Sequence, residues 1–321
     1  KKLDRLVSEF SLDYQNVRGL NSKLRKLYLD SFLFNSLVLV FTETWLKPNT
    51  LDTEILCPNY TIFRKDREIK VGGGILIAIN SNLFSEIILL PSNFNLNIEF
   101  IAVKLIFQNK IFFITCSYIP PHSDEHIYFA HSHAIVYVST LLSDHDHLII
   151  TGDFNLPNIV WTEDEDESCL LPSSKTSWIC DFFGKLSECG LYQINDTKNP
   201  FNNILDLIFV DTCLFSIKRC SPLSFPEDVF HPTLSVNLNI ENSSQIQTNN
   251  FGDLKSFNFN KADFSKINLL LSQIDWDVIF KDVRSVCDFN ACIATFYDKL
   301  NTIILKCVPK SKVKISSAPV W

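Results

Sequence analysis

The residues of this chain that can do chemistry stand in short polar motifs, each within or directly after an apolar run. The runs have the length and composition of buried strands, and open α/β sheets place ligand sites at strand ends. Carboxylates, amides and an imidazole gathered in one site suit a hard cation such as Mg²⁺ and chemistry on phosphate. In chain order the motifs are Asn16 in NVRGL, Glu43 in TETWL, Tyr118 in SYIPP, Asp153 and Asn155 in TGDFN, Asp206 in ILDLIF, and His231 in FHPTL.

The motif TGDFN carries the most specific chemistry. Asp153 can accept a proton from water, and Asn155 can hold that water or a phosphate oxygen. A simple turn after a strand would account for the same residues, because Gly, Asp and Asn all favour turns. Glu43 is similarly ambiguous, since it suits either a metal ligand or a surface acid beside Trp45. Neither motif decides the function by itself.

Asp206 lies among apolar neighbours, where a lone carboxylate needs a partner. The ring of His231 is one candidate, and this pairing would orient the imidazole and favour its charged form near a phosphate. A structural ion pair with Lys or Arg is the alternative. The six other histidines lie within 122–147 without a regular ligand spacing, so we expect most of them to be solvated.

Apolar runs of strand length and segments of helical periodicity must position these motifs. Consecutive strands with short connections favour antiparallel pairing. We therefore predict an α/β fold with two mostly antiparallel sheets flanked by helices, a four-layer α/β sandwich, and a C-terminal helical extension. Strands are expected at 8–16, 37–41, 74–80, 86–90, 98–107, 111–118, 148–151, 204–211, 215–222 and 233–240, and helices at 24–32, 124–142 and 174–189.

Composition limits the class of protein. With 321 residues, 46% of them hydrophobic, a sizeable core is expected. A net charge of −7 argues against a protein that binds nucleic acid over a large surface. It does not argue against an enzyme that binds only a few phosphates. The ten cysteines form no CxxC pair, which indicates reduced thiols of an intracellular protein. No apolar run reaches membrane-spanning length.

The basic residues Arg64, Lys65 and Arg67 either contact DNA or lie in a solvated loop.

Together and in this order, the motifs NVRGL, ETWL, RKDR…GGG, YIPP, GDFN and LDLIF resemble the endonuclease/exonuclease/phosphatase superfamily. More closely, they are similar to the apurinic-endonuclease-like domain of Jockey-like non-LTR retrotransposons. The resemblance implies a domain over 1–243. It also implies that 244–321 is a linker and helical connector before a reverse transcriptase that is missing here, so the chain reads as a piece of a longer protein.

This resemblance implies cleavage of one strand of double-stranded DNA with Mg²⁺ or Mn²⁺, leaving a 3′-hydroxyl that primes reverse transcription. Glu43 would bind the metal with Asn16 nearby. Asp153 would activate or position the attacking water, while Asn155 would hold the phosphate and Tyr118 would contact it. We expect Glu43, Asp153 and the ring of His231 to line one pocket.

In the same family pattern, Asp206 orients His231, which stabilises developing charge or moves a proton. The family usually ends in adjacent Asp-His, whereas Asp228 here stands three residues before His231. A metal contact from Asp228 would require a bulge or turn.

The resemblance also implies a monomeric, intracellular protein that acts in the nucleus, assembles with element RNA in the cytoplasm through the missing polymerase, and has no membrane partner. Two alternatives stay open. The same fold can act as a phosphomonoesterase or phospholipid phosphodiesterase, or the domain can be a catalytically decayed binder of nucleic acid.

Overall fold

The computed structural model describes residues 9–67, 72–94, 97–143, 145–156, 159–163, 169–212, 214–239, 255–257, 261–280 and 286–312. The chain divides into two compact units, Lys1–Ser244 and Gln245–Trp321. The first unit carries all the motifs described above.

One sheet of the first unit has six strands, in the order β13-β14-β1-β2-β4-β3. The pair β1–β2 is parallel, and the other neighbours are antiparallel. Its strands are β1 (Glu9–Asn16), β2 (Val38–Thr42), β3 (Tyr60–Lys65), β4 (Ile75–Asn80), β13 (Phe215–Arg219) and β14 (Leu234–Asn239).

The other sheet has eight strands, in the order β5-β6-β7-β8-β12-β11-β10-β9. Only β7–β8 is parallel among its pairs, so both sheets are mostly antiparallel as predicted. Its strands are β5 (Phe84–Ile87), β6 (Glu99–Phe107), β7 (Lys110–Tyr118), β8 (His147–Asp153), β9 (Val160–Glu163), β10 (Leu170–Ser173), β11 (Tyr192–Gln193) and β12 (Asp206–Val210).

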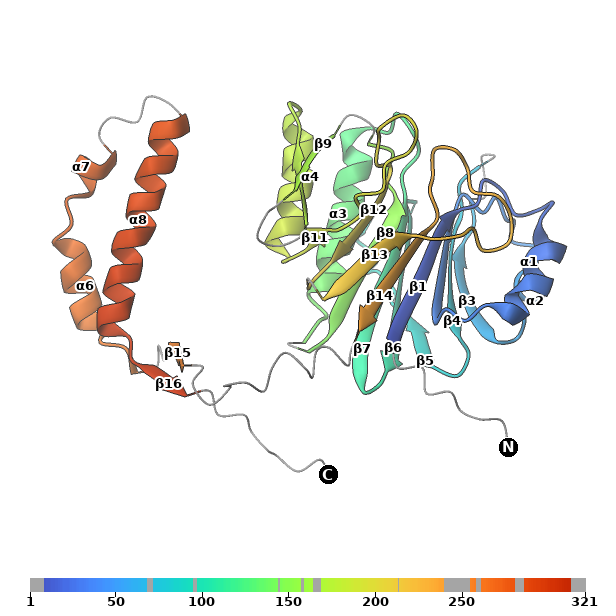
Figure 1. Ribbon diagram of the computed structural model, residues 1–321, viewed down its shortest axis with the longest axis horizontal. Helices are drawn as coiled ribbons and strands as arrows, with labels where there is room; N and C mark the ends of the chain where they lie inside the picture. Colours follow the sequence, from blue (N-terminus) through green and yellow to red (C-terminus); the bar gives the residue numbers. More distant parts are fainter. Residues whose placement is uncertain are drawn as a thin grey trace. The chain divides into compact units, whose positions relative to one another are not determined.

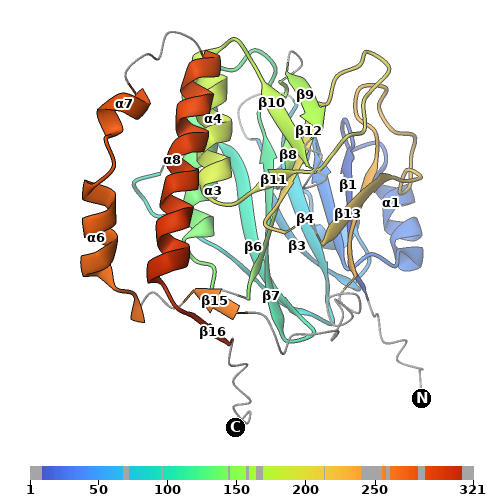
Figure 2. The same ribbon diagram turned by 60° about the vertical axis from the view of Figure 1, so that its left-hand side comes forward.

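The two sheets stack face to face, and helices cover their outer faces (Figures 1 and 2). Successive side chains of a strand point to opposite faces. In β2, Val38 and Val40 face the core between the sheets, while Leu39 and Phe41 pack with the helical residues Leu27 and Ile55 on the outside. The helices are α1 (Leu24–Asp30), η1 (Ser31–Leu33), α2 (Asp52–Ile55), α3 (Glu125–Ser139) and α4 (Ser177–Glu188).

Helices α3 and α4 cover the eight-stranded sheet in the same way. Tyr128 and Ile135 of α3 and Phe182 of α4 join Phe113 and Ile150 of the sheet in a second core cluster. The predicted four-layer α/β sandwich is therefore confirmed.

Several strands were not predicted, and each is short or lies toward a sheet edge. Strand β3 contains Arg64 and Lys65, whose charges had suggested a possible loop, and it forms the edge of its sheet. Strands β9, β10 and β11 have two to four residues each, too few for a clear alternation. Cross-strand pairing, which the local sequence does not display, decides these elements.

The second unit contains three helices among its described residues, as the helical periodicity predicted: α6 (Phe264–Ser272), α7 (Trp276–Phe280) and α8 (Val286–Cys307). The strands β15 (Lys255–Phe257) and β16 (Lys310–Lys312) form a small antiparallel sheet. None of the helices in the described part of the chain is both long and apolar enough to cross a membrane. The role of this unit as a connector stays a prediction.

Gly152 of β8 provides a test of the strand packing that positions Asp153. A Cβ atom at residue 152 would lie 2.2 Å from the carbonyl oxygen of Ser117 on the neighbouring strand. We expect Gly152→Ala to lower the free energy of unfolding by about 1–3 kcal/mol, the usual cost of overpacking. Chemical denaturation monitored by circular dichroism measures this change.

Gly184 supplies the matched control, because it lies in helix α4 and a Cβ there would meet no atom within 4 Å. Gly184→Ala should raise stability by about 0.5–1 kcal/mol, since Ala restricts the unfolded chain more than Gly. A Gly152→Ala protein as stable as the wild type would show that β7 and β8 are not packed this closely.

Candidate active site

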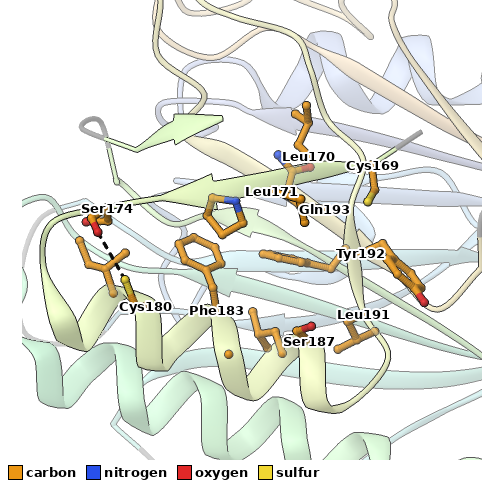
Figure 3. A pocket seen from close by; sticks show the side chains of 15 residues that line it. Cys169, Leu170, Leu171, Ser174, Cys180, Phe183, Ser187, Leu191, Tyr192 and Gln193 are labelled. Carbon is orange, nitrogen blue, oxygen red and sulfur yellow. Dashed lines mark hydrogen bonds between the residues drawn. The ribbon is translucent and has the colours of Figure 1, made fainter. Parts of the chain in front are cut away.

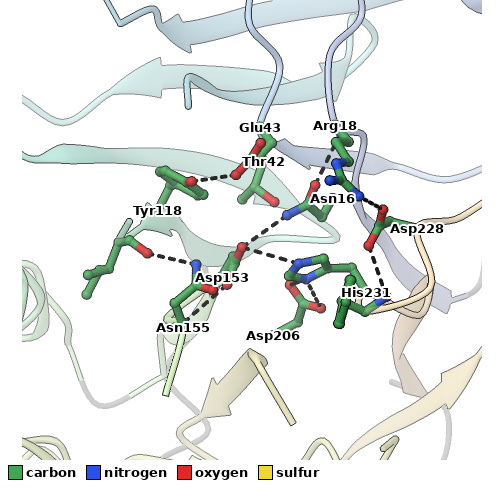
Figure 4. A network of polar contacts seen from close by, with 12 residues as sticks. Asn16, Arg18, Thr42, Glu43, Tyr118, Asp153, Asn155, Asp206, Asp228 and His231 are labelled. Carbon is green, nitrogen blue, oxygen red and sulfur yellow. Dashed lines mark hydrogen bonds and ion pairs between the residues drawn. The ribbon is translucent and has the colours of Figure 1, made fainter. Parts of the chain in front are cut away.

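The register of the sheets brings the polar motifs to one edge of the sandwich. Asn16, the last residue of β1, pairs with Thr42, the last residue of β2. In the other sheet, Asp153 at the end of β8 pairs with Tyr118 on one side and with Asp206 on the other. The side chains of these residues point toward one another in Figure 4.

A pocket of about 610 Å³ opens at this edge. Glu43, Asp153 and His231 all line it, so the expected convergence is observed. Its full lining is Asn16, Arg18, Glu43, Trp45, Pro121, His122, Asp153, Asn155, Leu205, Asp228, Phe230 and His231.

Asp153 is the most buried acid of the pocket, with 1% of its surface exposed. Its carboxylate accepts hydrogen bonds from Asn16 Nδ2 at 3.0 Å and from the backbone N–H of Asn155 at 3.2 Å. Burial raises the pKa of Asp153 to about 8; the ring of His231 opposes this rise, and the carboxylates of Asp206 and Glu43 add to it. A nearby cation would favour the ionised form of this carboxylate.

Asp206 and His231 form the pair that the sequence suggested. His231 Nδ1 lies 2.9 Å from Asp206 Oδ2 and 3.1 Å from Oδ1, while its Nε2 faces Asp153 Oδ2 at 3.7 Å. Burial disfavours the charged ring, but the carboxylates of Asp206 and Asp153 outweigh it and raise the pKa of His231 to about 10. This environment therefore favours the charged form of the His231 ring.

Tyr14 supports this pair from within the core. Its hydroxyl donates to Asp206 Oδ1 at 2.6 Å and lies 3.0 Å from Thr42 Oγ1. The pKa of Tyr14 is raised well above its usual value by burial and by the charges of Asp206 and Asp153, so the hydroxyl keeps its proton and serves as a donor.

Glu43 is held in a conformation that few non-glycine residues adopt, with φ of 55°. The indole Nε1 of Trp45 donates to Glu43 Oε2 at 2.8 Å, and the Tyr118 hydroxyl donates to Oε1. Trp45 itself has φ of 54°. Strained backbone that the surroundings hold in place is typical of functional sites.

Asn155 has φ of 48°, and its side-chain amide donates to the carbonyl of Ile119 at 2.9 Å. This bond joins the loop after β8 to the end of β7. The amide is thus fixed beside Asp153 at the rim of the pocket (Figure 4).

The departure from adjacent Asp-His is accommodated by a turn. The backbone N–H of His231 donates to the carbonyl of Asp228 at 3.0 Å, and the two residues form an antiparallel bridge. The carboxylate of Asp228 lies 2.6 Å from Nη1 of Arg18, and both side chains line the pocket. A metal contact from Asp228 stays a prediction, since in this arrangement the acid already has a cationic partner.

The basic residues proposed for DNA have internal partners. Arg64 forms ion pairs with Asp52 at 2.7 Å and Asp66 at 2.6 Å, and Arg67 pairs with Glu99. Burial lowers the pKa of Lys65. These contacts explain how a charged segment is placed in β3, and DNA binding by it stays a prediction.

Four of the six clustered histidines are exposed, as expected: His122, His126, His133 and His145. His131 is not solvated, because it is fully buried on α3 with Nδ1 3.2 Å from Ser117 Oγ. Burial lowers its pKa to about 3, which keeps the ring neutral. Among the described residues, none of the six belongs to a group that could hold a metal ion.

Asp153, Asp206 and His231 form a group that could hold a metal ion, since their ligand atoms all lie within 4.8 Å of one another. The ring of His231 would bind a metal ion only in its neutral form. Glu43 adds a third carboxylate to the same site, near enough to raise the pKa of Asp153. Carboxylate oxygens at this density fit a hard divalent cation such as Mg²⁺ or Mn²⁺.

Sequence reasoning missed four contributors: Tyr14, Arg18, Thr42 and Trp45. Tyr14 and Thr42 lie within buried strands, where an aromatic or β-branched residue is expected to pack in the hydrophobic core. Arg18 and Trp45 stand two residues after Asn16 and Glu43, so their positions in NVRGL and TETWL were a usable signal.

The Asp206–His231 pair can be tested by titration of the metal-free protein. The pKa of His231 is about 10 in the folded protein and about 6.5 in an unfolded chain, so the charged ring stabilises the fold. This stabilisation is complete below about pH 6.5 and is lost as the pH rises toward 10. Asp206→Asn should lower the pKa of His231 and reduce this pH-dependent contribution, because the partner that raises the pKa most is lost. NMR of the ring Hε1 proton, assigned with His231→Gln, measures the shift. Titration near 10 in both proteins would contradict the pairing.

Comparison with known proteins agrees with this architecture. The sequence model of the Endonuclease/Exonuclease/phosphatase family matches residues 14–235. No curated protein matches the chain. Among solved structures, the AP endonuclease LMAP from Leishmania major has a TM-score of 0.53 at 13% identity, covering 72% of this chain and 88% of that one.

Two further solved structures have lower scores. The endonuclease domain of TRAS1, a telomere-specific non-LTR retrotransposon, has a TM-score of 0.49 at 13% identity, covering 73% of this chain and 99% of that one. The 3′-5′ exonuclease NExo from Neisseria meningitidis has a TM-score of 0.49 at 15% identity, covering 71% and 98%. With the family model matching most of its first unit, the chain belongs to the endonuclease/exonuclease/phosphatase family of phosphate-ester hydrolases.

Proposed function

We propose that this protein is a Mg²⁺- or Mn²⁺-dependent endonuclease. It nicks one strand of double-stranded DNA by phosphodiester hydrolysis and leaves a 3′-hydroxyl that primes reverse transcription of a retroelement. The observation that carries this proposal is the single pocket lined by Glu43, Asp153 and His231, with Asp206 behind the ring of His231. The order of motifs along the sequence supports the retroelement context.

Glu43 and Asn16 are our candidates to hold the metal ion. Asp206 is the weaker candidate, because its oxygens already face the His231 ring and the Tyr14 hydroxyl. Glu43 lines the pocket, and its two donors leave further lone pairs on each oxygen. The ion would supply Lewis-acid stabilisation of charge on the phosphate.

The remaining residues act on water and phosphate. Asp153 positions the attacking water, with Asn16 and Asn155 fixing its carboxylate. The imidazolium of His231 lies on the other side of Asp153 and stabilises the negative charge that develops on the phosphate. Tyr118 keeps its proton, since burial and then its bond to Glu43 raise its pKa, and its hydroxyl donates that proton to the Glu43 carboxylate. A contact of Tyr118 with the phosphate stays a prediction.

Hydrolysis of a small phosphate ester is the second candidate, because a net charge of −7 favours small substrates over a polyanion. Arg18 is exposed and lines the pocket, and although its Nη1 pairs with Asp228, its other N–H groups could meet the phosphate of either substrate. Comparing plasmid nicking with release of phosphate from an inositol phosphate separates the two functions.

Plasmid relaxation tests the nuclease directly. We expect the purified protein to relax supercoiled plasmid with Mg²⁺ or Mn²⁺ and not with EDTA. Asp153→Ala and His231→Ala should each reduce the rate by about 10²–10⁴, the range for loss of a group that acts directly on the reacting atoms or on the charge that develops there. His126→Ala, an exposed histidine of α3, is the control and should nick normally. Nicking that persists in both site variants would refute the assignment.

Metal binding is tested separately from activity by thermal unfolding with Mn²⁺. A ligand that binds only the folded state stabilises it by about 2.7 kcal/mol at 100 times its dissociation constant. We expect wild type to show a rise in Tm and Glu43→Gln to lose most of it. Glu86→Gln, on the half-exposed edge strand β5, is the matched control and should keep the rise.

Equal Mn²⁺ stabilisation of wild type and Glu43→Gln would exclude Glu43 as a principal ligand. No stabilisation of any protein would favour the decayed, non-catalytic alternative.

A further inference from the structure

Two exposed phenylalanine rings stack beside the active-site pocket, and the roles assigned above do not use them. The rings of Phe201 and Phe230 have centroids 5.0 Å apart and an interplanar angle of 16°. Phe201 is 59% exposed and Phe230 is 39% exposed. Phe230 also lines the pocket and directly precedes His231. Burial alone does not explain a pair that leaves this much aromatic surface in water.

A buried asparagine holds the loop that carries Phe201. Asn199 is only 5% exposed, and its Oδ1 accepts the backbone N–H groups of Phe201 at 2.9 Å and Asn203 at 3.1 Å. The backbone N–H of Asn199 also donates to the carbonyl of Asn203 at 2.9 Å, which closes the turn. The ring of Phe201 therefore projects from a fixed turn.

The same asparagine ties this turn to the segment that carries Phe230. Asn199 Nδ2 donates to the carbonyl of Phe230 at 3.1 Å. The N–H of Phe230 donates in turn to Asp228 Oδ1 at 2.9 Å. Both ends of the Phe230 residue are thus held, and the stacked rings are arranged before any ligand binds.

We propose that Phe201 and Phe230 form a stacking platform for one unpaired nucleobase of the DNA substrate. Every base has a flat aromatic face, and proteins that bind unstacked nucleotides place aromatic side chains against it. The platform adjoins the pocket in which the phosphate is expected to lie, so a base and a phosphate of neighbouring nucleotides meet the two sites together. Arg18, whose side chain is 60% exposed, lines the same pocket; its Nη1 pairs with Asp228, and a phosphate would meet its remaining N–H groups.

This inference rests on the proposed function, because it takes DNA as the substrate. It adds a preference that the pocket does not supply: a target nucleotide that is unpaired or easily unstacked is bound more tightly than one in a regular duplex. Removing a base from its stack costs least where pairing is already lost, so the platform selects distorted sites.

The test measures equilibrium binding by fluorescence anisotropy in EDTA, where hydrolysis is not expected. Two labelled duplexes are compared, one with a single unpaired adenine and one with an abasic nucleotide at the same place. Phe201→Ala should weaken binding of the adenine duplex by about 5- to 150-fold, the range for loss of one aromatic stacking partner. Binding of the abasic duplex should change less than about twofold, because no base is present to stack.

Two further variants complete the test. Phe201→Trp should keep the affinity for the adenine duplex, since the indole offers at least as much stacking surface. Phe84→Ala removes a ring with nearly the same exposure, 57%, on the distant edge strand β5, and should change neither affinity. An unchanged Tm shows that Phe201→Ala is folded.

Equal affinity of wild type and Phe201→Ala for the adenine duplex would overturn the platform. Two other results would also overturn it: an equal loss of affinity for both duplexes in Phe201→Ala, or equal affinity of wild type for the two duplexes. A change only in self-association of Phe201→Ala, seen by sedimentation, would assign the rings to a protein contact and also overturn it. The adenine-specific loss without any plasmid nicking would keep the platform and refute the nuclease.

Discussion

The burial of two neighbouring carboxyl groups, those of Asp153 and Asp206, is the constraint on which the site depends. Both acids are almost fully removed from water, at 1% and 2% exposure, and they are paired residues on adjacent strands. Burial first, and the neighbouring carboxylates after it, raise the pKa of Asp153, so a negative charge on this acid needs compensation. The imidazolium of His231 lies between them, and Asn16 and Tyr14 donate hydrogen bonds from the facing sheet. The contacts that stabilise the acids therefore also join the two sheets.

The sandwich architecture makes this arrangement possible. Each sheet contributes one parallel pair, β1–β2 and β7–β8, and the ends of both pairs meet at the same edge of the molecule. Loops that follow these strand ends carry Glu43 and Asn155 with positive φ angles, so the backbone there is fixed by its surroundings. A rigid core thus holds side chains from distant parts of the sequence with little need for rearrangement, which is what electrostatic stabilisation of a transition state requires.

Much of this could be predicted from the sequence, because the strongest signals were local. An apolar run followed by a polar motif identified Asn16, Glu43, Tyr118, Asp153, Asp206 and His231, and the structure places all of them together. Tyr14 could not be identified, because a hydroxyl inside a buried strand looks like core until its partner across the sheets is known. The stack of Phe201 on Phe230 likewise depends on two loops that are distant in sequence. Short edge strands such as β9 and β11 were missed because pairing rather than composition creates them.

We propose that Glu43, Asp153 and His231 enclose one site for a divalent cation and a phosphate. Anomalous diffraction from crystals soaked in Mn²⁺ tests it most directly. We expect a strong anomalous peak in this pocket, in contact with the carboxylate of Glu43. Crystals that show Mn²⁺ only elsewhere on the surface, with this pocket free of anomalous signal at millimolar metal, would contradict it.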